Sequence, residues 1–226
     1  MVLNLLAHQP VTIKGETYTG LAPAANFIFL ETNQPDRLKV GIDWILKQSW
    51  NTRILLNLAI PDGEGWMFPM EEDPDVKALQ PAIDAGLLIV AAGGNSKVHN
   101  RLHANQFFTI GGFNDKGSRK SERYEPHPSV PFGYNSDGYW RPDLLAPYTY
   151  LPLPNLVGKK SAELDFFAGT YGASTLIAGL LWISQGISEL GNALSYFTIT
   201  IWLDKARRFN RNSSVFSTNS LFKHLT

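Results

Sequence analysis

The sequence predicts an α/β fold in which helices cover both faces of a parallel sheet. Two observations carry this prediction. Short apolar runs alternate along the chain with segments whose apolar residues recur at helical spacing, and residues 87–92 form an apolar run without a polar break. Strand–helix alternation is typical of α/β domains, and uninterrupted apolar strands are typical of parallel sheets that are buried on both sides.

The first elements of the sheet are expected between residues 27 and 58. Residues 27–30 form a short apolar run that predicts a buried strand. A helix should begin at Pro35, because apolar residues then recur at helical spacing as Leu38, Ile42, Ile45 and Leu46. Residues 53–58 predict a second strand.

The next helix has signals at both of its ends. Residues 73–75 read Asp-Pro-Asp, which places acidic residues and a proline where capping and the helix dipole favour them. Gly86 is a C-cap glycine that ends this helix. The strand of residues 87–92 follows, and residues 107–110 predict another.

The second half of the chain contains a long stretch with little periodicity. Residues 115–160 are rich in Pro, Gly, Tyr and Ser, and we expect them to form an irregular surface layer. After Thr170 the chain is apolar on nearly all sides, which predicts a helix buried in the centre. A further helix is expected over residues 192–209, where the domain of residues 1–209 would end. Residues 210–226 are expected to form a loosely docked tail.

The composition is that of one ordinary domain and excludes several classes of partner. The chain has 226 residues, and its 20 basic and 20 acidic side chains balance to a net charge of zero, so nothing global favours nucleic acid or an anionic membrane. The absence of cysteine excludes disulfides, thiolate metal sites and a cysteine nucleophile. No apolar run is long enough to predict a transmembrane helix. These features assign no compartment.

No cofactor and no metal are expected. Gly111, Gly112 and Gly117 do not form a dinucleotide-binding fingerprint. His99 and His103 have the spacing of helical metal ligands, but no third ligand is evident and their segment is typical of a loop, which favours a solvated or hydrogen-bonded pair.

Residues 169–179 carry the most informative pattern in the chain. They read Gly-Thr-Tyr-Gly-Ala-Ser-Thr-Leu-Ile-Ala-Gly. This run resembles the nucleophile segment of the subtilisin-like serine peptidases, the subtilases, which reads Gly-Thr-Ser-Met-Ala-x-Pro and, two residues later, Val-Ala-Gly. Tyr171 stands where the family has its nucleophilic serine, and Thr175 stands where the family has proline.

Four further segments resemble the same family and occur in the same order. Residues 89–95, Ile-Val-Ala-Ala-Gly-Gly-Asn, are similar to the strand and turn that present the family's oxyanion-hole asparagine. The other three are residues 20–30, residues 107–112, and residues 141–147 with Tyr148 where glycine is usual. The resemblance covers roughly residues 1–190. It implies the C-terminal two-thirds of a subtilisin-like domain, without the N-terminal aspartate strand and histidine motif.

The resemblance implies two catalytic positions and a group of substrate-binding positions. Asn95 falls at the oxyanion-hole position, and Tyr171 falls at the nucleophile position. The expected substrate-binding residues are Ala59, Ile60, Pro61, Gly93, Gly94, Gly169 and Thr170. The proline in this group removes a backbone donor from the edge that pairs with substrate in the family. The loop of residues 63–73 is expected to cover the cleft, with partner binding as the alternative.

These features predict a loss of proteolysis. A serine peptidase needs an activated hydroxyl, a base and a carboxylate that orients the base. The phenol oxygen of Tyr171 lies farther from the backbone than a serine Oγ does, so we expect it to overshoot the attack position. Ser174 is expected to serve packing. Residues 1–7 resemble the remainder of the family's histidine helix, which leaves His8 at the wrong end of that helix.

Three interpretations remain open. The first is a pseudopeptidase kept as a peptide- or protein-binding module. The second is a truncated or split piece of a serine endopeptidase whose aspartate and histidine come from a missing upstream segment, although no such segment can replace Tyr171. The third is a degenerate protein with only structural or interaction value. Because loss of the aspartate strand would expose a sheet edge, the expected partners include an upstream half-domain or an oligomer that covers the sheet.

Overall fold

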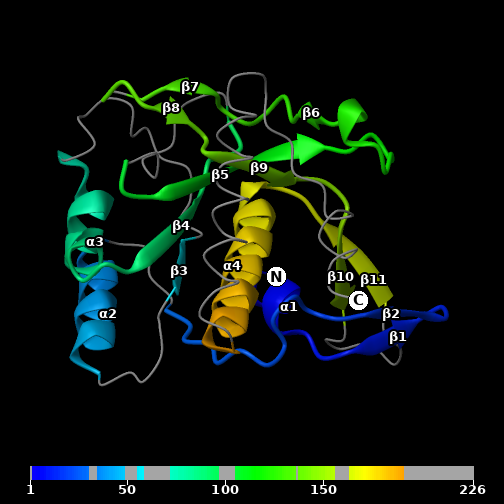
Figure 1. Ribbon diagram of the computed structural model, residues 1–226, viewed down its shortest axis with the longest axis horizontal. Helices are drawn as coiled ribbons and strands as arrows, with labels where there is room; N and C mark the ends of the chain where they lie inside the picture. The colour runs from blue at the N-terminus through cyan, green and yellow to red at the C-terminus, as the bar shows by residue number, and fades with distance from the viewer. Residues whose placement is uncertain are drawn as a thin grey trace.

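The computed structural model describes seven stretches of the chain (Figure 1). They are residues 2–30, 35–48, 55–58, 72–96, 105–135, 137–155 and 163–190.

A parallel sheet forms the centre of the molecule. Its parallel strands are β3 (Leu55–Leu58), β4 (Leu88–Ala92), β5 (Phe108–Asn114) and β9 (Leu144–Pro147), in this spatial order. The register pairs Leu55 with Leu88, Val90 with Phe108, and Ile110 with Leu144. The short strand β6 (Glu125–Pro126) pairs antiparallel with the end of β5.

Helices pack against both sides of β4. One cluster joins α4 (Thr170–Leu190) to the sheet, with Val90, Ile110, Leu144, Ala146, Ala173, Ile177 and Ala178 as its buried members. A second cluster joins α2 (Pro35–Lys47) and α3 (Pro74–Asp84) to the sheet, and includes Leu38, Ile42, Ile45, Val76, Leu79, Ile89 and Ala91. Because successive strand residues point to opposite faces, Val90 meets α4 while Ile89 and Ala91 meet α2 and α3.

The boundaries of α3 follow from its sequence. Asp73 Oδ1 accepts hydrogen bonds from the backbone N–H groups of Asp75 at 2.8 Å and Val76 at 3.4 Å, so it is the N-cap. The helix is followed by Gly86, whose φ of +71° favours glycine. The predicted start and end of this helix are confirmed.

Smaller elements surround the sheet. They are the helix α1 (Val2–Ala7), the 3₁₀ turn Ser121–Arg123, and three antiparallel hairpins: β1 (Val11–Ile13) with β2 (Glu16–Tyr18), β7 (Gly133–Tyr134) with β8 (Trp140–Arg141), and β10 (Leu151–Asn155) with β11 (Glu163–Phe167). Leu5 of α1 packs with Leu151 and Leu153 of β10. Figure 1 shows this hairpin beside α1, with α4 on the other side of that helix.

The prediction of a buried strand over residues 27–30 is wrong. These residues form no strand, and all four side chains are exposed. The apolar run by itself could not show whether a neighbouring strand would be present. None of the described residues pairs with it, and the run lies on the surface without regular secondary structure.

The prediction of an irregular layer over residues 115–160 is also only partly right. That stretch contributes β9 to the central sheet and β10 to a hairpin. The helix after Thr170 is buried in its first turns, whereas Trp182 further along is 37% exposed. The predicted helix of residues 192–209 and the tail of residues 210–226 lie outside the described residues. Among the described helices, none has the length and apolar character needed to span a membrane.

Candidate functional site

The N-terminus of α4 is joined to the turn that follows β4. Thr170, the first residue of α4, is completely buried. Asn95 Oδ1 accepts hydrogen bonds from Thr170 N at 2.8 Å and from Thr170 Oγ1 at 3.1 Å. The Gly94 N–H donates to Thr170 Oγ1 at 3.1 Å. Five of the predicted site residues, Gly93 to Asn95 together with Gly169 and Thr170, therefore lie together, and Tyr171 follows directly.

Glycine is required at several of these positions. Gly94 has a φ of +96° and Gly169 has a φ of +128°. Residues with a Cβ rarely adopt such backbone angles. A Cβ at Gly169 would lie 3.4 Å from Asn95 Oδ1 and 3.6 Å from Asn95 Nδ2. Gly93 donates its N–H to Ile110 O at 2.8 Å, and a Cβ there would lie 3.0 Å from the same oxygen. The glycines let the turn approach both α4 and β5.

The contacts of Asn95 orient its side-chain amide. Its oxygen accepts two hydrogen bonds from the first residue of α4, and its Nδ2 lies 3.6 Å from the position of a Cβ at Gly169. The start of a helix carries partial positive charge and favours negative groups. An amide donor beside this helix end is suited to bind a carbonyl or developing oxyanion.

The hydroxyl groups near Tyr171 are bonded to the backbone. Ser174 is completely buried, and its Oγ donates to Tyr171 O at 3.1 Å. Thr175 Oγ1 donates to the same carbonyl at 2.6 Å. The position and bonding of Ser174 agree with a packing role. The Tyr171 side chain is partly buried.

A side-chain contact between β3 and α4 supports this turn of the helix, and sequence reasoning missed it. Asn57 Nδ2 donates to Thr175 Oγ1 at 3.0 Å, across 118 positions in the chain. A series of hydrogen bonds thus runs from Asn57 through Thr175 to the carbonyl of Tyr171. The sequence signal for this contact was a single asparagine, Asn57, within the otherwise apolar strand of residues 55–58.

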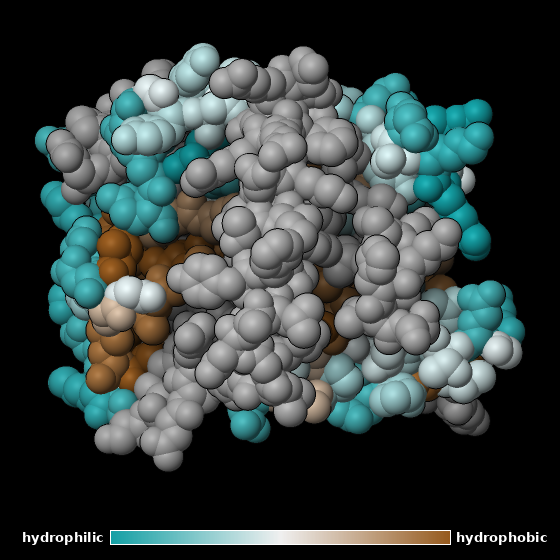
Figure 2. All heavy atoms as spheres, in the orientation of Figure 1, coloured by the Kyte–Doolittle hydropathy of each residue, from teal (hydrophilic) through white to brown (hydrophobic). Residues whose placement is uncertain are grey.

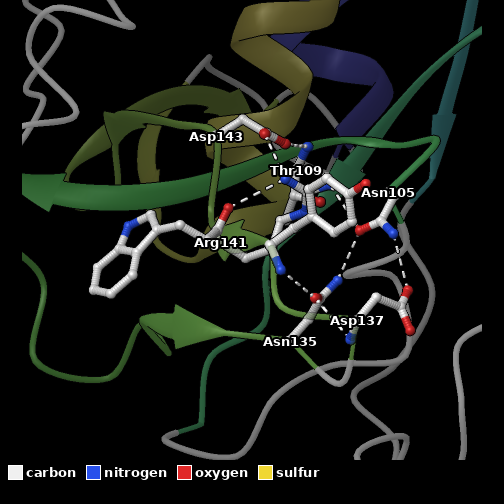
Figure 3. Close-up of polar contacts among 8 residues, drawn as sticks. Asn105, Thr109, Asn135, Asp137, Arg141 and Asp143 are labelled. Atoms are coloured by element: carbon white, nitrogen blue, oxygen red, sulfur yellow. Dashed lines mark hydrogen bonds and ion pairs between the residues drawn. The ribbon is translucent and has the colours of Figure 1, made fainter.

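Asp143, which directly precedes β9, links that strand to β5 (Figure 3). Its Oδ2 accepts from Thr109 N at 2.8 Å, and its own N–H donates to Thr109 O at 2.9 Å. Its Oδ1 pairs with Arg141 Nη1 at 2.7 Å. Burial raises the pKa of Asp143 above its ordinary value, and the Thr109 N–H and the Arg141 charge oppose that rise.

Figure 3 also shows how the β7–β8 hairpin is connected to the start of β5. Asn105 Oδ1 accepts from Asn135 Nδ2 at 2.9 Å and from Arg141 Nη2 at 3.5 Å, while Asn105 Nδ2 donates to Asp137 at 2.9 Å. Asn135 Oδ1 accepts the N–H groups of Asp137 and Tyr139. These contacts join the β7–β8 hairpin to the residues before β5, and nothing in the sequence pattern predicts them.

Tyr148 stands at a position where the subtilases usually have glycine. Its side chain packs against Gly112. A Cβ at Gly112 would lie only 2.2 Å from Tyr148 Cδ2. The Tyr148 ring stacks on His127 with centroids 3.8 Å apart, and desolvation lowers the pKa of that histidine. Tyr148 O accepts the N–H of Gly169 at 2.9 Å, so this packing also supports the turn that leads into α4.

The other candidate residues do not join the site. Ala59, Ile60 and Pro61 lie outside the described residues, as do His99 and His103. Within the described stretches, no group of three or more His, Cys, Asp or Glu side chains could hold a metal ion.

His8 is distant from the candidate site. It follows α1, whose Leu6 lies 2.8 Å from the position of a Cβ at Gly179. Gly179 is eight positions beyond Tyr171 in α4, or about 12 Å along the helix axis. The position of His8 agrees with the expectation that it does not replace the family's histidine.

Comparison with solved structures identifies the fold. The chain is similar to the prenylagaramide maturation protease PagA, with a TM-score of 0.55, 17% identity, and coverage of 83% of this chain and 63% of that one. It is also similar to the PatG macrocyclase in complex with peptide, with a TM-score of 0.59, 17% identity, and coverage of 84% and 53%. A third similar structure is the S41 psychrophilic protease, with a TM-score of 0.55, 20% identity, and coverage of 77% and 58%.

The chain has a subtilisin-like fold. The predicted α/β class is confirmed, and the resemblance to subtilases is confirmed for the fold. The chain spans less than two-thirds of the length of these three structures. No protein-family model matches the sequence, and no curated protein does either.

Proposed function

We propose that this chain is a subtilase-like pseudopeptidase that binds a peptide or protein segment at the N-terminus of α4 without cleaving it. The observation that carries the proposal is the place of Tyr171. It follows Thr170 directly, at the start of the helix that Asn95 joins through two hydrogen bonds. A tyrosine therefore stands where the resemblance to the subtilases calls for the nucleophilic serine.

The neighbouring hydroxyls support the loss of catalysis. A serine-type nucleophile needs its proton taken by a base and its oxygen directed at the substrate carbonyl. Thr170 Oγ1 is instead bonded to Asn95 and Gly94, and Ser174 Oγ is bonded inside the helix to Tyr171 O. Both hydroxyls are buried and serve the local structure.

The donor groups support the binding of a peptide carbonyl. Asn95 carries an amide donor beside the start of α4, and the helix end adds partial positive charge. The similar PatG macrocyclase structure contains a bound peptide.

Nuclear magnetic resonance of the ¹⁵N-labelled chain tests this function. A pool of end-blocked hexapeptides of random sequence is added, and the Asn95 side-chain amide and the Tyr171 N–H are followed. We expect saturable shifts at both groups, with the peptides recovered intact by mass spectrometry. Unchanged resonances at both groups, or cleaved peptides, would contradict the proposal.

A matched pair of variants separates binding from general effects. Asn95→Asp keeps an oxygen acceptor for Thr170 and removes the amide donor, so it should weaken peptide binding about 3- to 10-fold, the value of one hydrogen bond. Asn114→Asp makes the same chemical change at an exposed turn, where Asn114 Oδ1 accepts from Lys116 N, and should leave binding unchanged.

The second candidate function is that of a piece of a serine endopeptidase completed by an upstream segment. The coverage of 53–63% of the three similar chains favours it. Tyr171 opposes it, because a segment that supplies an aspartate and a histidine leaves the nucleophile position unchanged. Proteolysis on addition of such a segment to the unmodified chain would support this candidate against the pseudopeptidase.

A further inference from the structure

Two aromatic rings stack on the central sheet. The His127 ring lies on the Tyr148 ring, with centroids 3.8 Å apart and an angle of 14° between the planes. The Tyr148 ring packs in turn against Gly112 of β5, and the backbone N–H of His127 donates to Gly112 O at 2.9 Å. This pair, the His127–Tyr148 stack, is therefore seated on one residue of β5.

The backbone of Tyr148 connects the stack to the start of α4. Its N–H donates to Phe113 O, and its carbonyl accepts the N–H of Gly169, both at 2.9 Å. Gly169 O then accepts the N–H groups of Gly172 and Ala173 in the first turn of α4. A shift of Tyr148 would therefore reach the helix start that forms part of the candidate site.

The hydrogen bonding of His127 requires an uncharged ring. Its Nδ1 accepts the N–H of Ser129 at 3.3 Å, so the proton of the neutral ring is assigned to Nε2. A second proton would be added at Nδ1, where it would face the Ser129 N–H and break this bond. Protonation would also bring a charge into a half-buried stack. Both effects favour the neutral ring in this position.

The titratable groups on the elements around the stack have contacts of their own or are exposed. They are Lys116, Tyr124, Glu125, Arg141, Asp143 and Asp165. Lys116 pairs with Glu125 at 2.9 Å, and Figure 2 shows hydrophilic surface over the region of β6. Tyr124 stacks on Phe113, Arg141 pairs with Asp143, and Asp165 of β11 is exposed. Desolvation is the cause that lowers the pKa of His127.

We propose that the His127–Tyr148 stack makes the candidate site sensitive to pH: it holds the start of α4 while His127 is neutral, and protonation of His127 releases it. A released ring is hydrated, so both of its N–H groups can donate to water. Because the pKa of His127 is lowered from 6.5, the stack is complete above that value and weakens as the pH falls through the folded value. Peptide binding at the helix start should then weaken in acid, a consequence that rests on the function proposed above.

The test is nuclear magnetic resonance of the full chain from about pH 8 to about pH 5. The His127 ring signals give the midpoint of its titration, which we expect below 6.5. The exchange rate of the Gly169 N–H is divided by the rate of an unstructured peptide at the same pH, which removes the chemical effect of pH. We expect the protection of this N–H to fall at least about threefold in acid, with the midpoint of His127. The hexapeptide titration is repeated at both ends of the range, and affinity should fall with the protection.

Three variants assign the effect to His127. His127→Phe keeps a ring over Tyr148 that cannot take a proton, so the protection of Gly169 should no longer depend on pH. His8→Gln removes another histidine, which follows α1, and should keep the pH dependence. Asp143→Asn removes the nearby carboxyl with a raised pKa and should also keep it. Circular dichroism establishes that each variant is folded.

Several results would overturn the inference. Constant protection of Gly169 while the His127 ring titrates would show that the stack does not control the helix start. A midpoint at or above 6.5 would show that the tyrosine face stabilises the charged ring. The same fall in His127→Phe would assign the pH dependence to another group, and unchanged peptide affinity would remove the regulatory role. A chain that binds no peptide at any pH but keeps the Gly169 response would contradict the proposed function alone and would support the release of the stack.

Discussion

Asn95 Oδ1 accepts both the backbone N–H and the hydroxyl of Thr170, at 2.8 Å and 3.1 Å. This double contact joins the turn after β4 to the first residue of α4. The retained asparagine thus has a structural role that does not depend on any reaction.

Substitutions at Asn95 should separate its two roles. Asn95→Leu removes the acceptor at the helix start and should lower the free energy of unfolding by about 1–2 kcal/mol. Asn95→Asp keeps the acceptor and adds negative charge at a helix N-terminus, so it should stay within about 0.5 kcal/mol of the original chain. Urea denaturation followed by circular dichroism measures both. Equal losses in the two variants would contradict the acceptor role.

The Asn95–Thr170 contact should appear as an energetic coupling. Thr170→Val removes the hydroxyl that donates to Asn95 and accepts from Gly94, which leaves a buried N–H unsatisfied and should lower the free energy of unfolding by about 1–3 kcal/mol. Combined with Asn95→Leu, the loss should differ from the sum of the single losses by at least about 0.5 kcal/mol. A double-mutant cycle in urea measures this, and strict additivity would argue against the contact.

Gly112 should tolerate no side chain while Tyr148 is present. A Cβ at this position would lie 2.2 Å from Tyr148 Cδ2, so Gly112→Ala should lower the free energy of unfolding by about 1–3 kcal/mol through overpacking. In a Tyr148→Gly background the same substitution should have a smaller effect, because the three atoms nearest to that Cβ, which include the Tyr148 Cβ at 2.7 Å, all belong to the Tyr148 side chain and are gone. Thermal and urea unfolding of the four chains check this, and an equal effect in both backgrounds would refute it.

Asp143 should make the stability depend on pH in an identifiable direction. Its pKa is raised in the folded chain, chiefly by burial, so the folded state holds the proton more tightly than the unfolded state does. Its stabilising contribution is therefore complete below the ordinary pKa of 3.8 and is lost as the pH rises through the folded value. The difference in free energy of unfolding between the original chain and Asp143→Asn should fall over that range.

The carboxyl resonance of Asp143 gives a direct check. A ¹³C titration should show a midpoint above 3.8, the ordinary value. A midpoint at or below that value would show that the Arg141 ion pair and the Thr109 N–H outweigh burial.

The helices could be predicted from the sequence because their signals are local. The cap at Asp73, the glycine at position 86 and the spacing of Leu38, Ile42 and Ile45 all lie within a few turns of chain. The strand predicted at residues 27–30 failed because a strand needs a neighbour, and an apolar run does not show whether one exists. β5 extends to Asn114, beyond the predicted end at residue 110, because β9 and β6 pair with its later residues.

The candidate site could be predicted only where the resemblance supplied a local pattern. Gly94, Asn95, Gly169 and Thr170 lie together, and the oxyanion-hole and substrate-binding roles assigned to them stay predictions. The Asn57–Thr175 contact could not be predicted, because it depends on how α4 lies across β3, 118 positions away. The fit of Tyr148 against Gly112 likewise depends on the register of β9 beside β5.

The most direct test of the central claim is labelling of the purified chain with a fluorophosphonate probe, followed by intact mass measurement and peptide mapping. The positive control is a chain that carries Tyr171→Ser joined to an upstream segment with the family's aspartate and histidine. We predict no adduct on the original chain and one adduct on the control, at position 171. A stoichiometric adduct on the original chain, at Ser174 or any other hydroxyl, would contradict the account of an inactive nucleophile position in a subtilisin-like fold.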